Sequence, residues 1–457
     1  MMRSLFSGVS GLKNHQTRMD VIGHNISNVN TYGYKYTRAT FQDMLSQTIA
    51  GAAKPMDTRG GVNPKQVGLG MTIASIDRIF TQGSLQTTGN QTDLALSGDG
   101  FFIVADGDKK FYTRAGTFSL DRDGNLVNPG NGMKVQGWKS TTNERGDRVI
   151  NSSGSVEDIV IPIYGKVEAK ETSYVKYKCN LDSKMPIVPP NATARMRSSA
   201  GITTNIDVYD KVGNQHRLTL TLWKTGANQW TASAAMTDAM GPLTLDIPAS
   251  GNQPNQSNTS NRMNLRFSPE GRLISVADES SPDELNQGAL VANLNYRVTG
   301  DPTVRTVQLD LGKAGLIEGI TQFSSPSTTK AVEQNGYGMG YMESFNIDNS
   351  GVVTGVYSNG TKQALGQVAT SVFTNPQGLV AAGENLFEVS NNSGLPNIGP
   401  ASQGGRGTII AGSLEMSNVD LSEQFTDMIV TQRGFQANSR TISTSDQMLQ
   451  EVINLKR

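Results

Sequence analysis

Few residues in this chain could do chemistry, and a lone cysteine is the most notable of them. Cys179 is the single cysteine among 457 residues, and the three histidines are His15, His24 and His216. A thiol nucleophile needs a positioned base. His15 and His24 lie nine residues apart in an expected N-terminal helix and fit exposed polar positions, so a Cys–His enzyme is not predicted. A lone cysteine is usually a small buried apolar residue, yet this one lies in the lysine-rich run TSYVKYKCNLD.

Metal and cofactor chemistry is not predicted either. The stretch from Asp121 to Asn125, DRDGN, has the beginning of a calcium loop, but Leu126 stands where that loop needs Gly and Gly132 where it needs Glu. One Cys and three His are too few for a zinc site of the Cys/His type. Neither a nucleophile-elbow, a zinc-protease nor a phosphate-loop motif occurs. The sequence therefore predicts no metal, no cofactor and no enzyme.

Composition and charge exclude further classes of protein. The 40 Lys and Arg balance the 40 Asp and Glu, so the positive footprint of a nucleic-acid binder is missing. No apolar run reaches the roughly 18 residues that a membrane-spanning helix needs. The first 30 residues hold no apolar block of the length found in secretory signals. We expect no nucleic acid partner, no membrane insertion, and export by a route without a cleaved signal peptide.

The two ends of the chain have helical periodicity that the middle lacks. Apolar residues recur every seven positions at both ends, and the neighbouring stripe at Gln432, Ser439 and Asp446 is polar. Two interpretations stay open: amphipathic helices in an ordinary core, or helices that pair with each other or with another subunit. Opposite net charges at the two ends favour their pairing. The predicted seam consists of Leu5, Leu12, Met19, Ile26, Leu421, Met428, Phe435, Ile442 and Leu449.

The middle of the chain reads as β structure. Asp-Gly and Asn-Gly pairs punctuate short apolar runs, and 49 glycines suit many tight turns. A weak echo, FSLDRDGNLV, FSPEGRLI and FNIDNSGVV, indicates recurring hairpins. We expect a multidomain, mainly β protein with sandwich-like or barrel-like outer domains and terminal α-helices paired as a coiled coil. The expected divisions are an inner helical domain (1–30 and 418–457), extended arms (31–75 and 406–417), a middle β domain (76–169 and 326–405) and an inserted outer β domain (170–325).

Long motifs at both ends resemble a known family. The stretch from Ser4 to Lys35, with its core NISNVNTYGYK, is similar to the N-terminal signature of the bacterial flagellar rod and hook proteins. The stretch from Gly412 to Leu455, with SNVDL and QRGFQAN, resembles their C-terminal signature. Gly83 to Val104 and Tyr112 to Val127 match as well, so the resemblance covers about half of the chain.

The resemblance implies a structural role. Within the family, the large β insertion favours the hook group, whose subunits form a flexible tube that transmits motor torque to the filament. It implies a homopolymer in the flagellar hook, outside the cytoplasmic membrane and periplasmic in a spirochaete. The implied partners are rod, hook cap and hook–filament junction proteins and the type III export apparatus. A distal rod protein remains the alternative, and a secreted β-rich adhesin or hydrolase is a further one.

The resemblance also gives Cys179 a role. The chain is similar in particular to spirochaete hook proteins, whose neighbouring subunits become joined by lysinoalanine between a Cys and a Lys. By this resemblance the cross-link joins Cys179 to Lys166, with Lys170 as the second candidate and Asn180 as a hydrogen-bonding neighbour. Such an addition needs the lysine amine held against the site. The cross-link would form without any enzyme other than the subunits themselves.

Overall fold

A computed structural model describes residues 2–52, 54–55, 60–143, 148–189, 191–237, 243–246, 261–278, 289–298, 301–328 and 331–455. The chain divides into two compact units. Unit 1 contains residues 1–163, 344–356 and 362–457, and unit 2 contains residues 164–343 and 357–361. The insertion expected at 170–325 falls within unit 2.

Unit 2 is a β-sandwich. Its apolar core combines alternate residues of two five-stranded sheets, such as Leu218 and Leu220 from one and Leu294 and Leu309 from the other. This period-two alternation leaves the intervening residues facing outward. One sheet has the order β17 (Ile202–Tyr209), β18 (Gln215–Gly226), β19 (Gln229–Met236), β21 (Arg262–Phe267), β22 (Leu273–Asp278). The other has the order β20 (Thr244–Asp246), β23 (Ala289–Val298), β24 (Asp301–Lys313), β15 (Tyr174–Tyr177), β26 (Ala331–Gln334).

Smaller elements complete unit 2. The strands β16 (Cys179–Asp182) and β25 (Ile320–Phe323) run parallel as a separate pair. The strand β14 (Lys166–Val167) pairs in antiparallel register with the first residues of β27 (Gly340–Ile347), whose residues from Ser344 onward belong to unit 1. The short helix α2 (Ala194–Ala200) begins at Thr193, whose side chain accepts a hydrogen bond from the Met196 main-chain nitrogen.

The β region of unit 1 is built around a larger antiparallel sheet. Aromatic residues fill its core, with the rings of Phe101, Tyr112 and Phe373 in edge-to-face contact. The main path is β28 (Val352–Tyr357), β29 (Lys362–Val372), β11 (Lys134–Thr142), β7 (Phe101–Asp106), β8 (Lys109–Thr113), β31 (Leu386–Glu388), β30 (Val380–Gly383). Beside it lie β9 (Ser119–Leu120), β10 (Leu126–Val127), β12 (Arg148–Ile150), β13 (Glu157–Asp158), β32 (Asn397–Pro400) and the short helix η1 (Pro376–Gly378).

The same five-residue turn recurs in both units. In each copy the main-chain oxygen of the first residue accepts a hydrogen bond from the nitrogen of the fourth, and the nitrogen of the first residue donates to the oxygen of the fifth. This is the pattern of a type I turn closed by a glycine bulge. The fourth residue is a glycine with φ between +77° and +94°, a region that side chains rarely adopt. Three copies confirm the hairpin echo expected from the sequence. The turns begin at Asp121, Asp210, Ser268, Asp348 and Tyr357.

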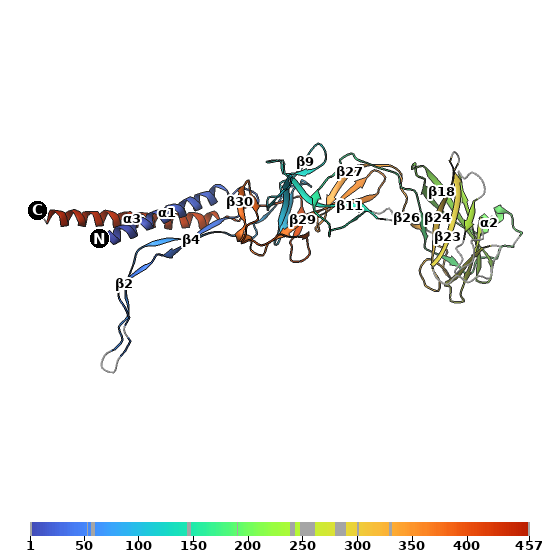
Figure 1. Ribbon diagram of the computed structural model, residues 1–457. Coiled ribbons are helices and arrows are strands. Elements are labelled where there is room, and N and C mark those ends of the chain that lie inside the picture. Colours follow the sequence, from blue (N-terminus) through green and yellow to red (C-terminus); the bar gives the residue numbers. More distant parts are fainter. Residues whose placement is uncertain are drawn as a thin grey trace. The chain divides into compact units, whose positions relative to one another are not determined.

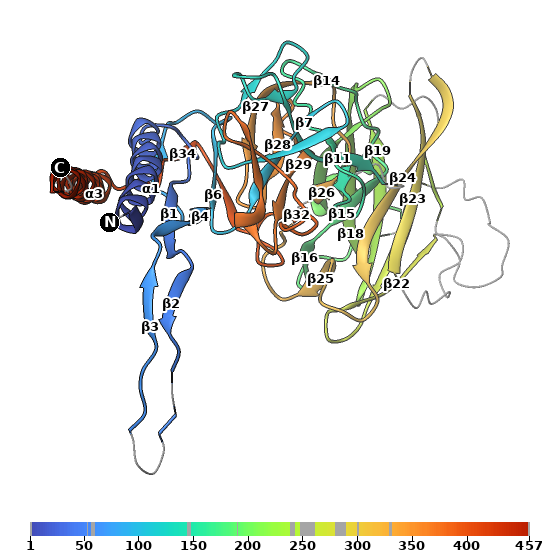
Figure 2. The ribbon, with the colours of Figure 1, turned by 60° about the vertical axis from the view of Figure 1, so that its left-hand side comes forward.

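The chain ends form the helical part of unit 1. Helix α1 (Met2–Ser27) lies beside helix α3 (Leu421–Asn454), as Figures 1 and 2 show from two sides. Between α1 and the β region, the strands β1 (Thr37–Asp43) and β4 (Met71–Arg78) pair, and β2 (Ser46–Ala50) and β3 (Lys65–Gly68) form an exposed ribbon. Two short pairs lead back to α3: β6 (Leu94–Ser97) with β33 (Thr408–Ala411), and β5 (Leu85–Thr87) with β34 (Ser413–Glu415).

The structure thus confirms the expected fold class, a mainly β chain whose terminal helices pack together. Within the described ranges, no helix is both long and apolar enough to cross a membrane. Over the same residues, no three acidic, His or Cys side chains gather in a way that could hold a metal ion.

Candidate functional site

The helix pair, α1 with α3, is held together mainly by small and polar residues. A Cβ added at Gly8 would lie 3.0 Å from Ile442 Cγ1, and one added at Gly434 would lie 2.8 Å from the His15 ring. The residues of α3 that are fully buried are Gln424, Thr431 and Ser445. Because these three side chains are polar, they add little buried apolar area to the contact.

The predicted seam residues are only partly covered in the single chain. Leu421 is exposed, and the other eight are half-buried. Gln432, Ser439 and Asp446, which were predicted to lie beside the seam, are exposed. The polar residues Thr431 and Ser445, which directly precede Gln432 and Asp446, are buried. Further large apolar side chains of the two helices are exposed: Phe6, Val9, Phe425, Ile429, Val430, Met448, Val452 and Ile453.

Asn25 connects the end of α1 to both neighbouring segments. Its buried amide donates to Thr37 O at 2.7 Å and to Gln424 Oε1 at 3.0 Å. Its Oδ1 accepts from the Thr37 nitrogen and from the Tyr34 hydroxyl. One side chain thereby fixes α1, α3 and the start of β1, which explains the polar motif between Asn25 and Lys35.

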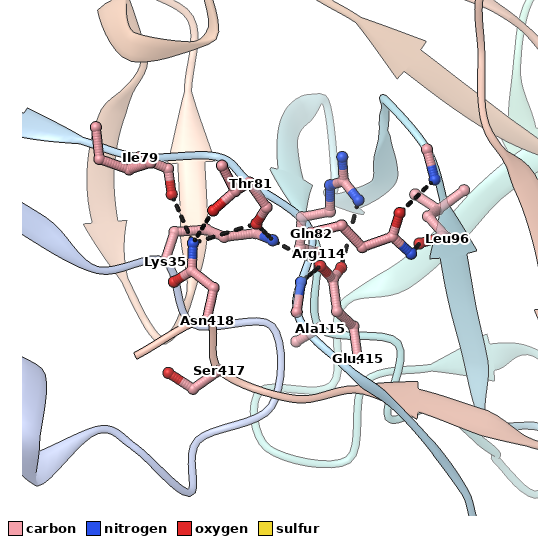
Figure 3. Close-up of polar contacts among 12 residues, drawn as sticks. Lys35, Ile79, Thr81, Gln82, Leu96, Arg114, Ala115, Glu415, Ser417 and Asn418 are labelled. Atoms are coloured by element: carbon pink, nitrogen blue, oxygen red, sulfur yellow. Dashed lines mark hydrogen bonds and ion pairs between the residues drawn. The ribbon is translucent and has the colours of Figure 1, made fainter. Parts of the chain in front are cut away.

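Asn418 and Asp420 fix the start of α3 through hydrogen bonds. Asn418 Oδ1 accepts from the Tyr36 nitrogen at 2.8 Å. The Asn418 amide donates to Ile79 O at 2.9 Å (Figure 3). Asp420 is the N-cap of α3, where its carboxylate accepts from the nitrogens of Ser422 and Glu423. The SNVDL turn therefore sets the direction in which α3 leaves the β region.

A buried ion cluster lies beside these contacts (Figure 3). Glu415 Oε1 is 2.6 Å from Lys35 Nζ, and Glu415 Oε2 is 3.3 Å from an Arg114 guanidinium nitrogen. Burial lowers the pKa of Lys35 and Arg114, and the Glu415 carboxylate opposes that shift. No sequence pattern predicted this Glu415 cluster, although Lys35 and Glu415 lie inside the two quoted signatures.

Cys179 lies in the core of unit 2. It begins β16, where Cys179 and Leu181 are buried and Asn180 and Asp182 are half-buried. Cys179 is 6% exposed, and burial raises the pKa of its thiol to about 12. Lys176 and Lys178 lie nearby in the sequence, but desolvation is what determines the state of this thiol. In the single folded chain, the thiol is neutral and sheltered.

The partners expected for Cys179 lie on different strands. Lys166 is an exposed residue of β14, with Nζ 5.7 Å from the centre of the Tyr341 ring. Lys170 exchanges two main-chain hydrogen bonds with Tyr337. Asn180 follows Cys179, and its side chain binds the next strand: Oδ1 accepts from the Phe323 nitrogen at 2.9 Å. The structure thus pairs the strands of Lys166 and Cys179 with β27 and β25, respectively.

Four segments of the chain match described families. Residues 5–35 match the flagella basal body rod protein family, and residues 95–172 match the flagellar hook protein FlgE/F/G D1 domain. Residues 180–337 match the flagellar basal body protein FlaE D2 domain. Residues 410–455 match the flagellar basal body rod FlgEFG protein C-terminal family.

Curated relatives match along the whole chain. The flagellar hook protein FlgE of Treponema pallidum is 49% identical over 467 residues, which cover all of both chains. The chain belongs to the flagellar hook protein family. The hook protein of Borreliella burgdorferi is 48% identical, again over the full length of both chains. A basal-body rod protein of Bacillus subtilis also matches over 458 residues at 29% identity, so length alone does not separate hook from rod proteins.

A solved structure supports the same fold for this hook-family chain. The crystal structure of the Helicobacter pylori flagellar hook protein FlgE2 aligns with a TM-score of 0.52 and 15% identity. The alignment covers 72% of this chain and 100% of that one. At this identity the likeness concerns the fold.

Proposed function

We propose that this chain is the structural subunit of the flagellar hook and polymerises with itself into a flexible tube that transmits torque. The observation that carries the proposal is the helix pair, whose apolar residues stay uncovered in one chain while small and polar residues make the internal contact. Exposed apolar surface of this extent marks an interaction site. A second copy supplies the same apolar stripe, so repeated copies complete the seam as in a coiled coil.

The surroundings follow from the same role. The terminal helices line the channel of the tube, the arms contact neighbouring copies, and the β domains point outward. The subunit works in the hook, outside the cytoplasmic membrane, in the periplasm if its source is a spirochaete. It reaches that place through the flagellar type III export apparatus. It meets rod proteins at one end of the hook, junction proteins at the other, and the hook cap during growth.

The test is assembly of a variant that leaves the single chain intact. Ile429 is 58% exposed, so Ile429→Asp removes apolar surface without burying a charge in the monomer. We expect ordered tubes from the wild type under assembly conditions by electron microscopy and none from Ile429→Asp. Gln432→Asp places the same side chain at an exposed polar position of α3 and keeps tube formation. Tubes from Ile429→Asp at the wild-type yield would contradict the proposal.

We propose further that assembled subunits become cross-linked between Cys179 and Lys166, or Lys170 in second place. Loss of a proton from Cα and of the sulfur as hydrosulfide leaves dehydroalanine at position 179. The neutral lysine amine then adds to Cβ while Cα regains a proton, so one H₂S leaves for each bond formed. Exposure of Lys166 supports its role as nucleophile.

The burial of Cys179 makes this reaction depend on assembly. Because Cys179 is only 6% exposed, neither a base that takes its Cα proton nor the lysine amine reaches it in the single folded chain. Contact with a neighbouring copy must therefore open β16 before sulfur is lost. We expect wild-type tubes to give a high-mass ladder on denaturing gels with reductant, and Cys179→Ala or Lys166→Ala tubes to give monomer. A ladder that persists in Cys179→Ala would exclude this cross-link, and peptide masses reduced by one H₂S would locate it.

A further inference from the structure

The two lysines considered for the cross-link each lie directly across an antiparallel pairing from a tyrosine. Lys166 of β14 is the register partner of Tyr341 in β27. Lys170, four residues later, is the bridge partner of Tyr337. Directly opposed residues of an antiparallel pair point to the same face of the sheet, with Cβ atoms about 4.5–5.5 Å apart. Each lysine therefore has an aromatic neighbour that is set by the strand register.

The Lys166 amine is in contact with the ring of its partner. Lys166 Nζ lies 5.7 Å from the centre of the Tyr341 ring, which is within the range of a cation–π contact. Lys166 is exposed, and Tyr341 is 45% exposed. Among the residues that the structure describes, no carboxylate forms an ion pair with Lys166, whereas Lys139 pairs with Glu157. The ring is therefore the contact that determines where this amine lies.

The main chain, not side-chain packing, holds Tyr341 in place. Its nitrogen donates to Ser358 Oγ at 3.0 Å, and its oxygen accepts from the Ser358 nitrogen at 2.8 Å. On the other side, the Met342 nitrogen donates to Gly165 O at 3.1 Å. All of these residues belong to unit 2. We therefore expect that the ring can be removed without loss of the strand pairing beneath it.

Addition to dehydroalanine makes two demands on the lysine amine. The amine must stay near the place of reaction, because a held reactant acts at a high effective concentration. It must also be neutral, because an ammonium group has no free electron pair. A ring at an exposed position favours the ammonium form by only about two- to fivefold. This loss is small beside the gain from holding a long, flexible side chain in place.

We propose that Tyr341 is a positioning residue for the cross-link, whose ring holds the Lys166 amine in place for addition to residue 179 of a neighbouring copy. This role rests on the cross-link proposed above, whereas the contact between ring and amine is a property of the single chain. The ring has two effects of opposite sign. It slows the reaction of the amine with a small reagent in solution, and it speeds the reaction with the partner that assembly brings close.

Tyr341→Leu tests both effects at once. In tubes, we expect the ladder on denaturing gels with reductant to form roughly tenfold more slowly than in the wild type. In the monomer, labelling of Lys166 by acetic anhydride, read from peptide masses against the other lysines, should become about two- to fivefold faster. Tyr341→Phe keeps the ring and should restore both wild-type rates. Equal melting temperatures of the three proteins check that the fold is intact.

Tyr337→Leu is the matched control, because it makes the same change at the tyrosine across from Lys170. We expect it to keep the wild-type ladder and the wild-type labelling of Lys166. A slower ladder in Tyr337→Leu, with Tyr341→Leu at the wild-type rate, would transfer the role to the Lys170 pair and overturn the proposal.

The remaining outcomes separate this role from the cross-link itself. A ladder at the wild-type rate in Tyr341→Leu would overturn the role of the ring while the cross-link stands. A ladder as slow in Tyr341→Phe as in Tyr341→Leu would also contradict it, since the hydroxyl would then carry the effect. If wild-type tubes give no ladder, the cross-link fails and the role fails with it, and the labelling rates then show only whether the ring contacts the amine.

Discussion

Gly11 of α1 faces Asn438 of α3 so closely that a Cβ on Gly11 would lie 2.6 Å from the Asn438 amide nitrogen. The absence of a side chain on α1 therefore sets how near the two helices approach. Gly23, on the same helix, has no atom within 4 Å of its added Cβ. The two glycines provide a matched pair for separating helix packing from helix propensity.

We expect Gly11→Leu to separate the helix pair and Gly23→Leu to stabilise α1. Leucine favours a helix over glycine by about 0.8 kcal/mol, and only at position 23 is there room for it. Hydrogen exchange of α3 amides should rise in Gly11→Leu and stay the same or fall in Gly23→Leu. Equal protection in the two variants would mean that the close approach has no energetic role.

Replacing Asn25 should destabilise unit 1. Asn25→Ala leaves the Thr37 carbonyl and nitrogen and the Tyr34 hydroxyl without this partner, and a buried group left unsatisfied costs about 1–3 kcal/mol. Asn30→Ala, at an exposed position, should change stability by less than about 0.5 kcal/mol. Urea unfolding followed by far-ultraviolet circular dichroism measures both, and equal midpoints for the two variants would contradict the role given to Asn25.

The stability of unit 2 should fall at alkaline pH because of Cys179. The thiol has a pKa of about 12 in the folded chain against an ordinary value of 9.0. Between these values the unfolded chain releases the proton and the folded chain keeps it, so rising pH favours unfolding by up to about 4 kcal/mol. Below pH 9 the thiol contributes no pH dependence. Cys179→Ala should lose less stability than the wild type between pH 8 and pH 10.5 in urea titrations, and parallel losses would exclude this origin.

Replacing two turn glycines of unit 2 with alanine should lower its stability by different amounts. Gly271 and Gly360 occupy the same position of the repeated turn, with φ of +82° and +77°. A Cβ at Gly271 would meet the main-chain oxygen of Gln322, whereas Gly360 faces open space. Gly360→Ala should cost only the backbone strain of about 1–2 kcal/mol, and Gly271→Ala should lower the melting temperature further. Calorimetry measures the melting temperatures of the two variants. Equal values would show that the main chain at Gln322 moves away from the added Cβ without an energetic cost.

Local patterns were enough to predict the elements but not their partners. The seven-residue spacing of Leu421, Met428 and Phe435 predicted α3 because helix periodicity is a property of neighbouring residues. The Gly-containing hairpins followed from turn chemistry for the same reason. The face that α3 turns toward α1 did not follow, since it depends on Gly8 and Gly11 of a segment more than 400 residues earlier.

Long-range charge pairing was beyond sequence reasoning. Nothing in the local sequence of Lys35, Arg114 or Glu415 shows that they share one buried site, because each is an ordinary charged residue in its own segment. The inward direction of the Cys179 thiol was equally hidden, since the polar run around it includes the outward-facing residues of the same strands. A single sequence gives the types of these residues but does not show which of them are in contact.

The incompletely covered apolar stripe of the helix pair has a consequence for how the proposed polymer forms. We expect a first encounter between two copies to cover only part of the stripe on each, and most of the burial to come when several neighbours surround the same helices. Growth therefore begins with an unfavourable nucleus and continues by favourable addition at an existing end. Purified subunit should show a lag phase and a critical concentration, and short fragments of preformed tube should abolish the lag.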